Sequence, residues 1–132
     1  MICYAGRMST LLPPLPLLFL RLSIASCFAA FGVWEIVGPN LWTAYVPPAV
    51  AALVDPVTLV FIHGIVLVVT AVGLLSGWRP RLWSGVAVAV LLELCITIWL
   101  DEGLSDVLIR DVALLLAAAS LFAQSMERKP LQ

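Results

Sequence analysis

The stretch FIHGIVLVVTAVGLLSGWRPRLWSGVAVAVLLELCITIWL, residues 61–100, decides the fold, because it holds two long apolar segments joined by a short basic turn. Before the turn, residues 57–75 contain one ionisable side chain, His63, and after it residues 82–100 contain only Glu93. Runs of about 18 or more apolar residues with so few charges are typical of helices that cross a membrane. The stretch therefore predicts a pair of transmembrane helices.

The turn between them, residues 76–81 (SGWRPR), is too short to form a domain and too basic to enter lipid. Pro80 has no backbone donor and disfavours helical dihedral angles at Arg79, so it separates two helices rather than continuing one. Trp78 and Trp83 flank the turn, as tryptophans do at the headgroup level. We expect the turn to lie at one membrane face and the rest of the chain to pack against this helix pair.

The composition agrees with a membrane protein. Of the 132 residues, 63% are hydrophobic and 11% are charged, whereas charged residues make up about a quarter of a soluble domain. The formal net charge of −1, without a basic patch outside the membrane flanks, excludes nucleic-acid binding. One histidine, scattered carboxylates and three cysteines without a C-x-x-C pair do not match a metal site, and no phosphate-binding loop or activated nucleophile is present.

Along the whole chain, the pattern predicts an all-α integral membrane four-helix bundle in a single domain, residues 1–132. The helices are expected over residues 16–37, 57–76, 82–100 and 107–124. An interfacial connector, residues 38–56, joins the first two helices and includes a short helix over residues 49–53 that Pro48 starts. Its Trp42 and Tyr45 resemble aromatic anchors at the membrane surface and are our candidates for contacts with a partner protein.

The charged residues predict the orientation of the bundle. Five basic residues fall on one side of a four-helix arrangement: Arg7, Arg79, Arg81, Arg128 and Lys129. The opposite connectors carry acidic residues: Asp55, Asp101, Glu102 and Asp106. By the positive-inside rule, both termini and the turn are cytoplasmic and the connector faces outward. We therefore expect a multi-pass protein of a bacterial-type inner membrane.

Each predicted helix carries one stripe of small and polar residues, and such stripes face the interior of membrane bundles. In the first helix the stripe is Arg21, Ala25, Phe28, Gly32 and Glu35. In the second it is His63, Thr70 and Gly77, beside a Gly73-x-x-x-Gly77 pair. In the third it is Gly85, Ala89, Glu93 and Thr97, and in the fourth Arg110, Ala113, Ala117, Ser120 and Gln124. We expect the four stripes to face one another.

Five ionisable side chains in these helices are expected to form one cluster in the outer leaflet: Glu35, His63, Glu93, Arg110 and Asp111. Counted from the outer helix ends at 1.5 Å per residue, they lie roughly 5 to 10 Å below the outer surface. Three carboxylates do not balance one arginine and one histidine, so either one carboxylate carries a proton or His63 is charged. Because Glu93 and His63 are expected to be the deepest, we interpret them as the proton-handling pair.

Structural roles for the same residues stay open. Arg110 paired with Glu93 or Glu35 would only hold helices together. Asp111, taken alone, is better explained as a complement to the positive start of its helix. His63 would serve equally well as a hydrogen-bond partner between two helices.

Four short segments carry a family resemblance through their order and spacing: Arg21-Leu22 with Gly32, residues 42–47 (WTAYVP), His63-Gly64 through residues 77–82 (GWRPRL), and Ile109-Arg110-Asp111. Together they resemble the DoxX family of small four-helix membrane proteins, over residues 21–123. The family includes the membrane subunit of a thiosulfate:quinone oxidoreductase. The resemblance therefore implies a redox-linked membrane subunit that partners a soluble redox protein. The chain departs from the family pattern at two positions, with Glu35 where members often have lysine and Leu67 where an acidic residue is common.

Three functions follow from these patterns. The first is the binding of a quinone-like molecule between the helices by the ionisable cluster. This function makes a quinone the suggested cofactor. The second is a structural or assembly protein that docks a soluble partner through the connector, and the third, less favoured, is a small proton-coupled transporter. The small-residue stripes permit a homo-oligomer as readily as a monomer in membrane lipid, and any enzymatic activity stays open.

Overall fold

The computed structural model describes residues 15–127, and within this range it contains helices and turns but no strand. Four long helices make up most of it: α1 (Leu15–Val37), α3 (Pro56–Ser76), α4 (Pro80–Asp101) and α5 (Asp106–Glu127). Their ends differ from the predicted ends by at most three residues. By length and composition, α1, α3 and α4 are each able to cross a membrane. The prediction of an all-helical membrane protein is confirmed to that extent.

The connector between α1 and α3 folds into three short helical turns: η1 (Pro39–Leu41), η2 (Thr43–Tyr45) and α2 (Pro48–Ala51). Pro39 and Pro48 stand at the first position of their turns, where a missing backbone N–H breaks no helical bond. The short helix α2 thus begins at Pro48, as the proline predicted, but it ends at Ala51 rather than at residue 53.

Asp55 ends the connector and caps α3. Its Oδ2 atom accepts hydrogen bonds from the Thr58 hydroxyl at 2.7 Å and from the Thr58 backbone N–H at 2.8 Å. These bonds stabilise the charged carboxylate and so lower the pKa of Asp55. The cap satisfies one of the free N–H groups at the start of α3 and marks where the connector gives way to the helix.

The turn between α3 and α4 contains two residues in the left-handed region of backbone conformation. Gly77 ends α3 with a φ of 67°, and Arg79 precedes α4 with a φ of 47°. Glycine adopts this conformation without a steric penalty, and Pro80 then begins α4. The guanidinium of Arg79 lies 5.3 Å from the centre of the Trp78 ring. The chain therefore reverses where the sequence predicted a turn.

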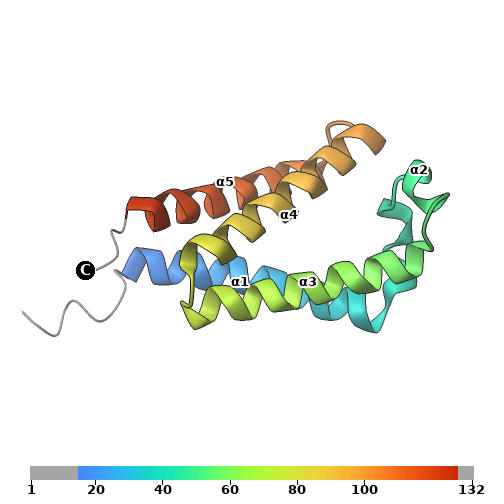
Figure 1. The fold of residues 1–132 in the computed structure, drawn as a ribbon. Coiled ribbons are helices and arrows are strands. Elements are labelled where there is room, and N and C mark those ends of the chain that lie inside the picture. The colour runs from blue at the N-terminus through green and yellow to red at the C-terminus, as the bar shows by residue number, and fades with distance from the viewer. Residues whose placement is uncertain (1–14, 128–132) are drawn as a thin grey trace, which may run out of the picture.

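The four long helices form two antiparallel pairs, α1 with α3 and α4 with α5, and most helix contacts lie within the pairs. In Figure 1 the pairs lie close together at the end that holds the α3–α4 turn, and they separate toward the end that holds α2. The start of α1, the turn and the end of α5 share one end of the molecule (Figure 1). Arg79 belongs to this end, whereas the predicted basic positions Arg7, Arg128 and Lys129 lie outside the described residues.

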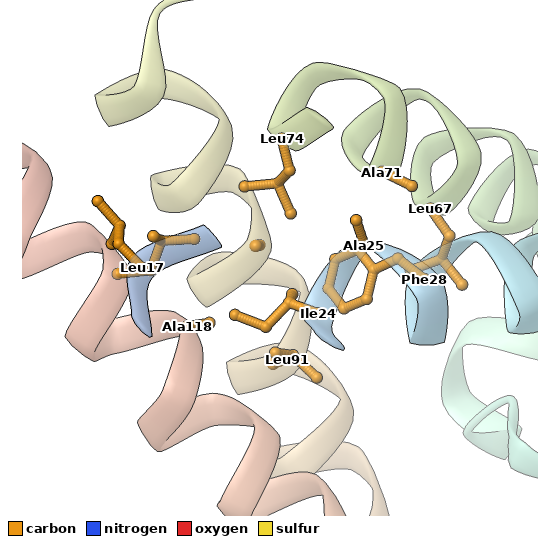
Figure 2. Close-up of a cluster of buried hydrophobic side chains, with 11 residues drawn as sticks. Leu17, Ile24, Ala25, Phe28, Leu67, Ala71, Leu74, Leu91 and Ala118 are labelled. Carbon is orange, nitrogen blue, oxygen red and sulfur yellow. The ribbon is translucent and has the colours of Figure 1, made fainter. Parts of the chain in front are cut away.

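The main hydrophobic core lies where the two pairs meet, and all four long helices contribute to it (Figure 2). Its buried members are Leu17, Ile24, Ala25, Phe28, Leu67, Ala71, Leu74, Ala87, Leu91, Ala118 and Leu121. Arg81 ties α4 to the end of α5, because its Nε donates to the Ser125 carbonyl at 3.0 Å and its Nη2 donates to the Met126 carbonyl at 2.9 Å. The bonds of Arg81 lie within one pair, whereas the shared core joins the two pairs near the α3–α4 turn and they diverge toward the other end.

Two glycines bring α1 and α3 into close contact. A Cβ atom on Gly32 would lie 2.7 Å from the Gly64 carbonyl oxygen, and a Cβ on Gly64 would lie 2.8 Å from the Gly32 carbonyl oxygen. Small residues allow membrane helices to approach this closely. The predicted Gly73-x-x-x-Gly77 pair does not play this part, because Gly73 packs against the Trp83 ring and Gly77 forms the turn.

The predicted stripe of small and polar residues matches the buried face of α1 but not those of α4 and α5. On α1 the stripe residues Ala25, Phe28, Gly32 and Glu35 are buried as expected. On α4 the buried face is instead Ser84, Ala87, Leu91, Cys95 and Ile98, and on α5 it is Leu108, Asp111, Ala118, Leu121 and Ser125. The predicted stripes of these two helices are therefore wrong as buried faces, because α4 and α5 pack mainly on each other and not on a symmetrical four-helix interior.

Candidate functional site

The separation of the two helix pairs leaves a cavity of about 610 Å³ beside the connector. Its wall combines α1, the connector, α3, α4 and α5, and it is mostly apolar and aromatic. All seven residues that the sequence singled out line it: Glu35, Trp42, Tyr45, His63, Glu93, Arg110 and Asp111. The fold thus brings them together, while their role in binding stays a prediction.

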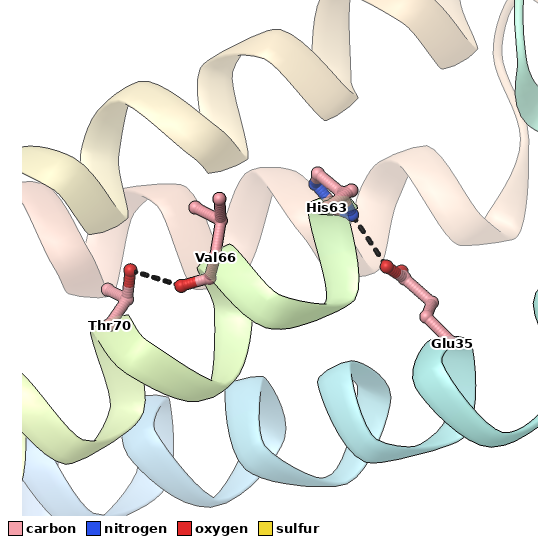
Figure 3. Close-up of polar contacts among 4 residues, drawn as sticks. All are labelled: Glu35, His63, Val66 and Thr70. Atoms are coloured by element: carbon pink, nitrogen blue, oxygen red, sulfur yellow. Dashed lines mark hydrogen bonds and ion pairs between the residues drawn. The ribbon is translucent and has the colours of Figure 1, made fainter. Parts of the chain in front are cut away.

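A hydrogen bond joins α1 to α3 across this wall. The Oε2 atom of Glu35 lies 2.7 Å from Nδ1 of His63, and Figure 3 shows the two side chains meeting between the helices. Glu35 is 7% exposed, and Gly64 makes room for it, because a Cβ on Gly64 would come within 2.9 Å of the Glu35 Cβ. His63 was expected to act with Glu93, yet its direct partner is Glu35.

The pairing with Glu35 gives the two nitrogens of His63 different roles. When Glu35 is ionised, Nδ1 carries a hydrogen and donates it to the carboxylate. The other nitrogen, Nε2, is then an acceptor in the neutral ring and a donor in the charged ring. Nε2 is enclosed and has no hydrogen-bond partner among the described residues. A buried polar atom without a partner is uncommon in proteins, which makes this edge of His63 a candidate contact for a ligand.

Arg110 pairs within its own helix. Its Nε donates to Oδ1 of Asp111 at 2.9 Å, and its guanidinium lies 5.1 Å from the centre of the Phe31 ring on α1. Asp111 is 5% exposed, whereas half of the Arg110 side chain is exposed. The predicted alternative, in which Arg110 binds Glu93 or Glu35 to hold helices together, is not what the structure shows.

Glu93 is the acidic residue of the cavity wall that forms no direct ion pair within residues 15–127. Its Oε1 accepts a long hydrogen bond from the Thr97 hydroxyl at 3.5 Å, beyond the usual O–H···O range. The side chain is exposed toward the cavity that it lines, and its predicted depth in the membrane stays a prediction. The sequence predicted more carboxylates than basic groups in this cluster, and Glu93 is the carboxylate without a basic group in direct contact.

Aromatic rings from α1 and the connector pack together at the cavity. The Trp42 ring meets Phe31 edge to face at 5.8 Å and Trp34 at 5.4 Å, and Tyr45 lies 5.9 Å from Trp42. The indole nitrogen of Trp42 is enclosed without a partner among the described residues. Sequence reasoning missed Phe31 and Trp34, although Phe31 stands one helical turn before Glu35 and so shares its face.

This arrangement suits a lipid-soluble molecule with a flat apolar body and a few oxygen atoms. Ligand cavities in proteins are typically lined by apolar and aromatic side chains with a small number of polar groups that fix orientation. Here those groups are His63, Arg110 and Glu93, each on a different helix.

Comparison of the sequence with models of known families and with curated proteins, and of the structure with solved structures, found no match.

Proposed function

We propose that the chain is a DoxX-like protein of the bacterial inner membrane that binds a quinone-like molecule and serves as a redox-linked membrane subunit. The observation that carries this proposal is the cavity of about 610 Å³, which has aromatic walls and polar groups from three helices. Sites for small molecules commonly measure about 300–1,000 Å³, so a quinone head group fits.

The cavity offers contacts for both parts of a quinone. The flat ring would pack against Phe31 and Trp42, since aromatic groups favour edge-to-face and offset contacts. The ring carbonyls are acceptors, and the half-exposed guanidinium of Arg110 supplies donors beyond the Nε that binds Asp111. His63, whose ring Glu35 holds through Nδ1, would meet an oxygen of the quinone through Nε2.

In the membrane, α5 forms the fourth crossing in this proposal, and both termini and the α3–α4 turn face the cytoplasm. The separated ends of the helix pairs then lie in the outer leaflet, so a ligand reaches the cavity sideways from the lipid. The basic turn with Arg79 supports this orientation, because cytoplasmic loops carry an excess of Arg and Lys.

The first test is extraction and mass spectrometry of the protein after purification in a mild detergent. Wild type should carry a quinone in about equimolar amount, and His63→Ala and Arg110→Gln should lose most of it. Arg79→Gln is the matched control, because it removes the same charge outside the cavity. Wild type that neither carries a quinone nor binds an added short-chain quinone would exclude the proposed ligand. Full occupancy in both cavity variants would exclude the proposed site.

A further inference from the structure

The cavity contains one acidic side chain, Glu93, that forms no direct ion pair with the described residues of its wall. Glu35 pairs with His63 at 2.7 Å, and Asp111 pairs with Arg110 at 2.9 Å. Glu93 has the Thr97 hydroxyl at 3.5 Å and forms no ion pair with any residue in the part of the chain that the structure describes. Two of the three carboxylates of the cavity therefore have a direct nitrogen partner on another side chain, and the third, Glu93, has none.

A lone carboxylate in a transmembrane helix is costly. It is tolerated when it binds a proton, faces water or pairs with a positive charge. Glu93 lies on α4, which is long and apolar enough to cross a membrane, and it lines the cavity rather than the packed face of that helix. A positively charged ligand would supply the missing charge.

The cavity wall is also suited to a cation because of its aromatic rings. Phe31, Trp34, Trp42 and Tyr45 all line the cavity. One cation already rests on this wall, since the Arg110 guanidinium lies 5.1 Å from the Phe31 ring centre. Aromatic faces attract organic cations through their negative π surfaces, most strongly where water is excluded.

We propose that the cavity binds a lipid-soluble organic cation, such as a quaternary ammonium or protonated amine attached to an aromatic body. The positive group lies at Glu93, and the apolar body lies against the aromatic rings. The connector turn η2, which includes Tyr45, contacts α4, the helix that carries Glu93. This inference goes beyond the proposed function and does not rest on quinone binding.

The test compares two probes of the same shape, a biphenyl that carries a trimethylammonium group and a biphenyl that carries a neutral tert-butyl group. Binding to wild type in a non-ionic detergent is followed by quenching of tryptophan fluorescence, because Trp34 and Trp42 line the cavity. Signals are corrected for partition into empty micelles. Wild type should bind the cation about tenfold more tightly than the neutral probe.

Variants show whether Glu93 is responsible for this preference. Glu93→Gln should remove it, and Glu93→Asp should keep it. Glu102→Gln should also keep it, because it removes an equal charge just beyond the end of α4. Equal affinity of wild type for the two probes would overturn the proposal without any variant, and so would an equal loss in Glu93→Gln and Glu102→Gln. Quinone binding is measured separately, so its absence would leave this result unaffected.

Discussion

At the scale of single residues, the pair of Glu35 and His63 is the contact that most depends on the fold. The two side chains are 28 positions apart in sequence, and their 2.7 Å contact joins α1 to α3. Glu35 is buried, so its carboxylate depends on His63 for compensation. The sequence indicated that both residues were buried in helices but did not indicate that they form a pair.

A double-mutant cycle tests this contact. Glu35→Ala and His63→Ala should each lower the free energy of unfolding in detergent, and the two effects should be coupled by about 1 kcal/mol, in the range found for polar pairs between membrane helices. The same cycle on Glu102 and His63 is the control, since Glu102 lies outside the cavity. Simple additivity of Glu35→Ala and His63→Ala would show that the pair does not stabilise the protein.

At the scale of elements, the approach of α1 to α3 depends on Gly32 and Gly64. A Cβ atom on either glycine would lie within 2.8 Å of a backbone oxygen atom. A backbone atom cannot move away from the contact as the end of a flexible side chain can. The close approach is what allows Glu35 to reach His63 from the neighbouring helix. Packing of these elements therefore positions the wall of the cavity.

Substitution of Gly64 should separate these helices. Gly64→Ala should lower the free energy of unfolding by about 1–3 kcal/mol, as overpacking usually does. Gly85→Ala serves as the control, because its Cβ would meet the Phe122 ring at an ordinary 3.4 Å. Thermal melting of the three proteins in one detergent measures the difference. Equal stability of Gly64→Ala and wild type would show that the helices are not held at this distance.

At the scale of the whole molecule, the separation of the two helix pairs creates the cavity. The pairs share a core at the end near the α3–α4 turn, and the cavity lies beside the connector. A second apolar groove of about 510 Å³ follows the outer side of α4 and α5, and no charged residue lines it. Of these two, the cavity beside the connector combines apolar walls with ionisable groups.

Labelling of single cysteines tests the proposed orientation of the molecule. In a variant whose native cysteines are replaced by serine, Leu53→Cys and Leu104→Cys should react with an impermeant maleimide from the outside of intact cells. Trp78→Cys should react only after the membrane is opened, since it belongs to the turn at the opposite end. All three side chains are exposed, so access to them depends on the membrane. Labelling of Trp78→Cys in intact cells would show that the protein has the opposite orientation in the membrane.

The sequence by itself determined the helical class, the ends of the helices and the turn, because apolar run length, proline and glycine act locally. It also placed the ionisable residues near one end of the bundle. The buried face of α4 depended on tertiary structure, since a helix that is apolar on most sides carries no signal for one face. The buried face of α5 depended on its packing against α4. The partners of His63 and Arg110, and the charge left on Glu93, likewise depended on how far the two helix pairs separate in space.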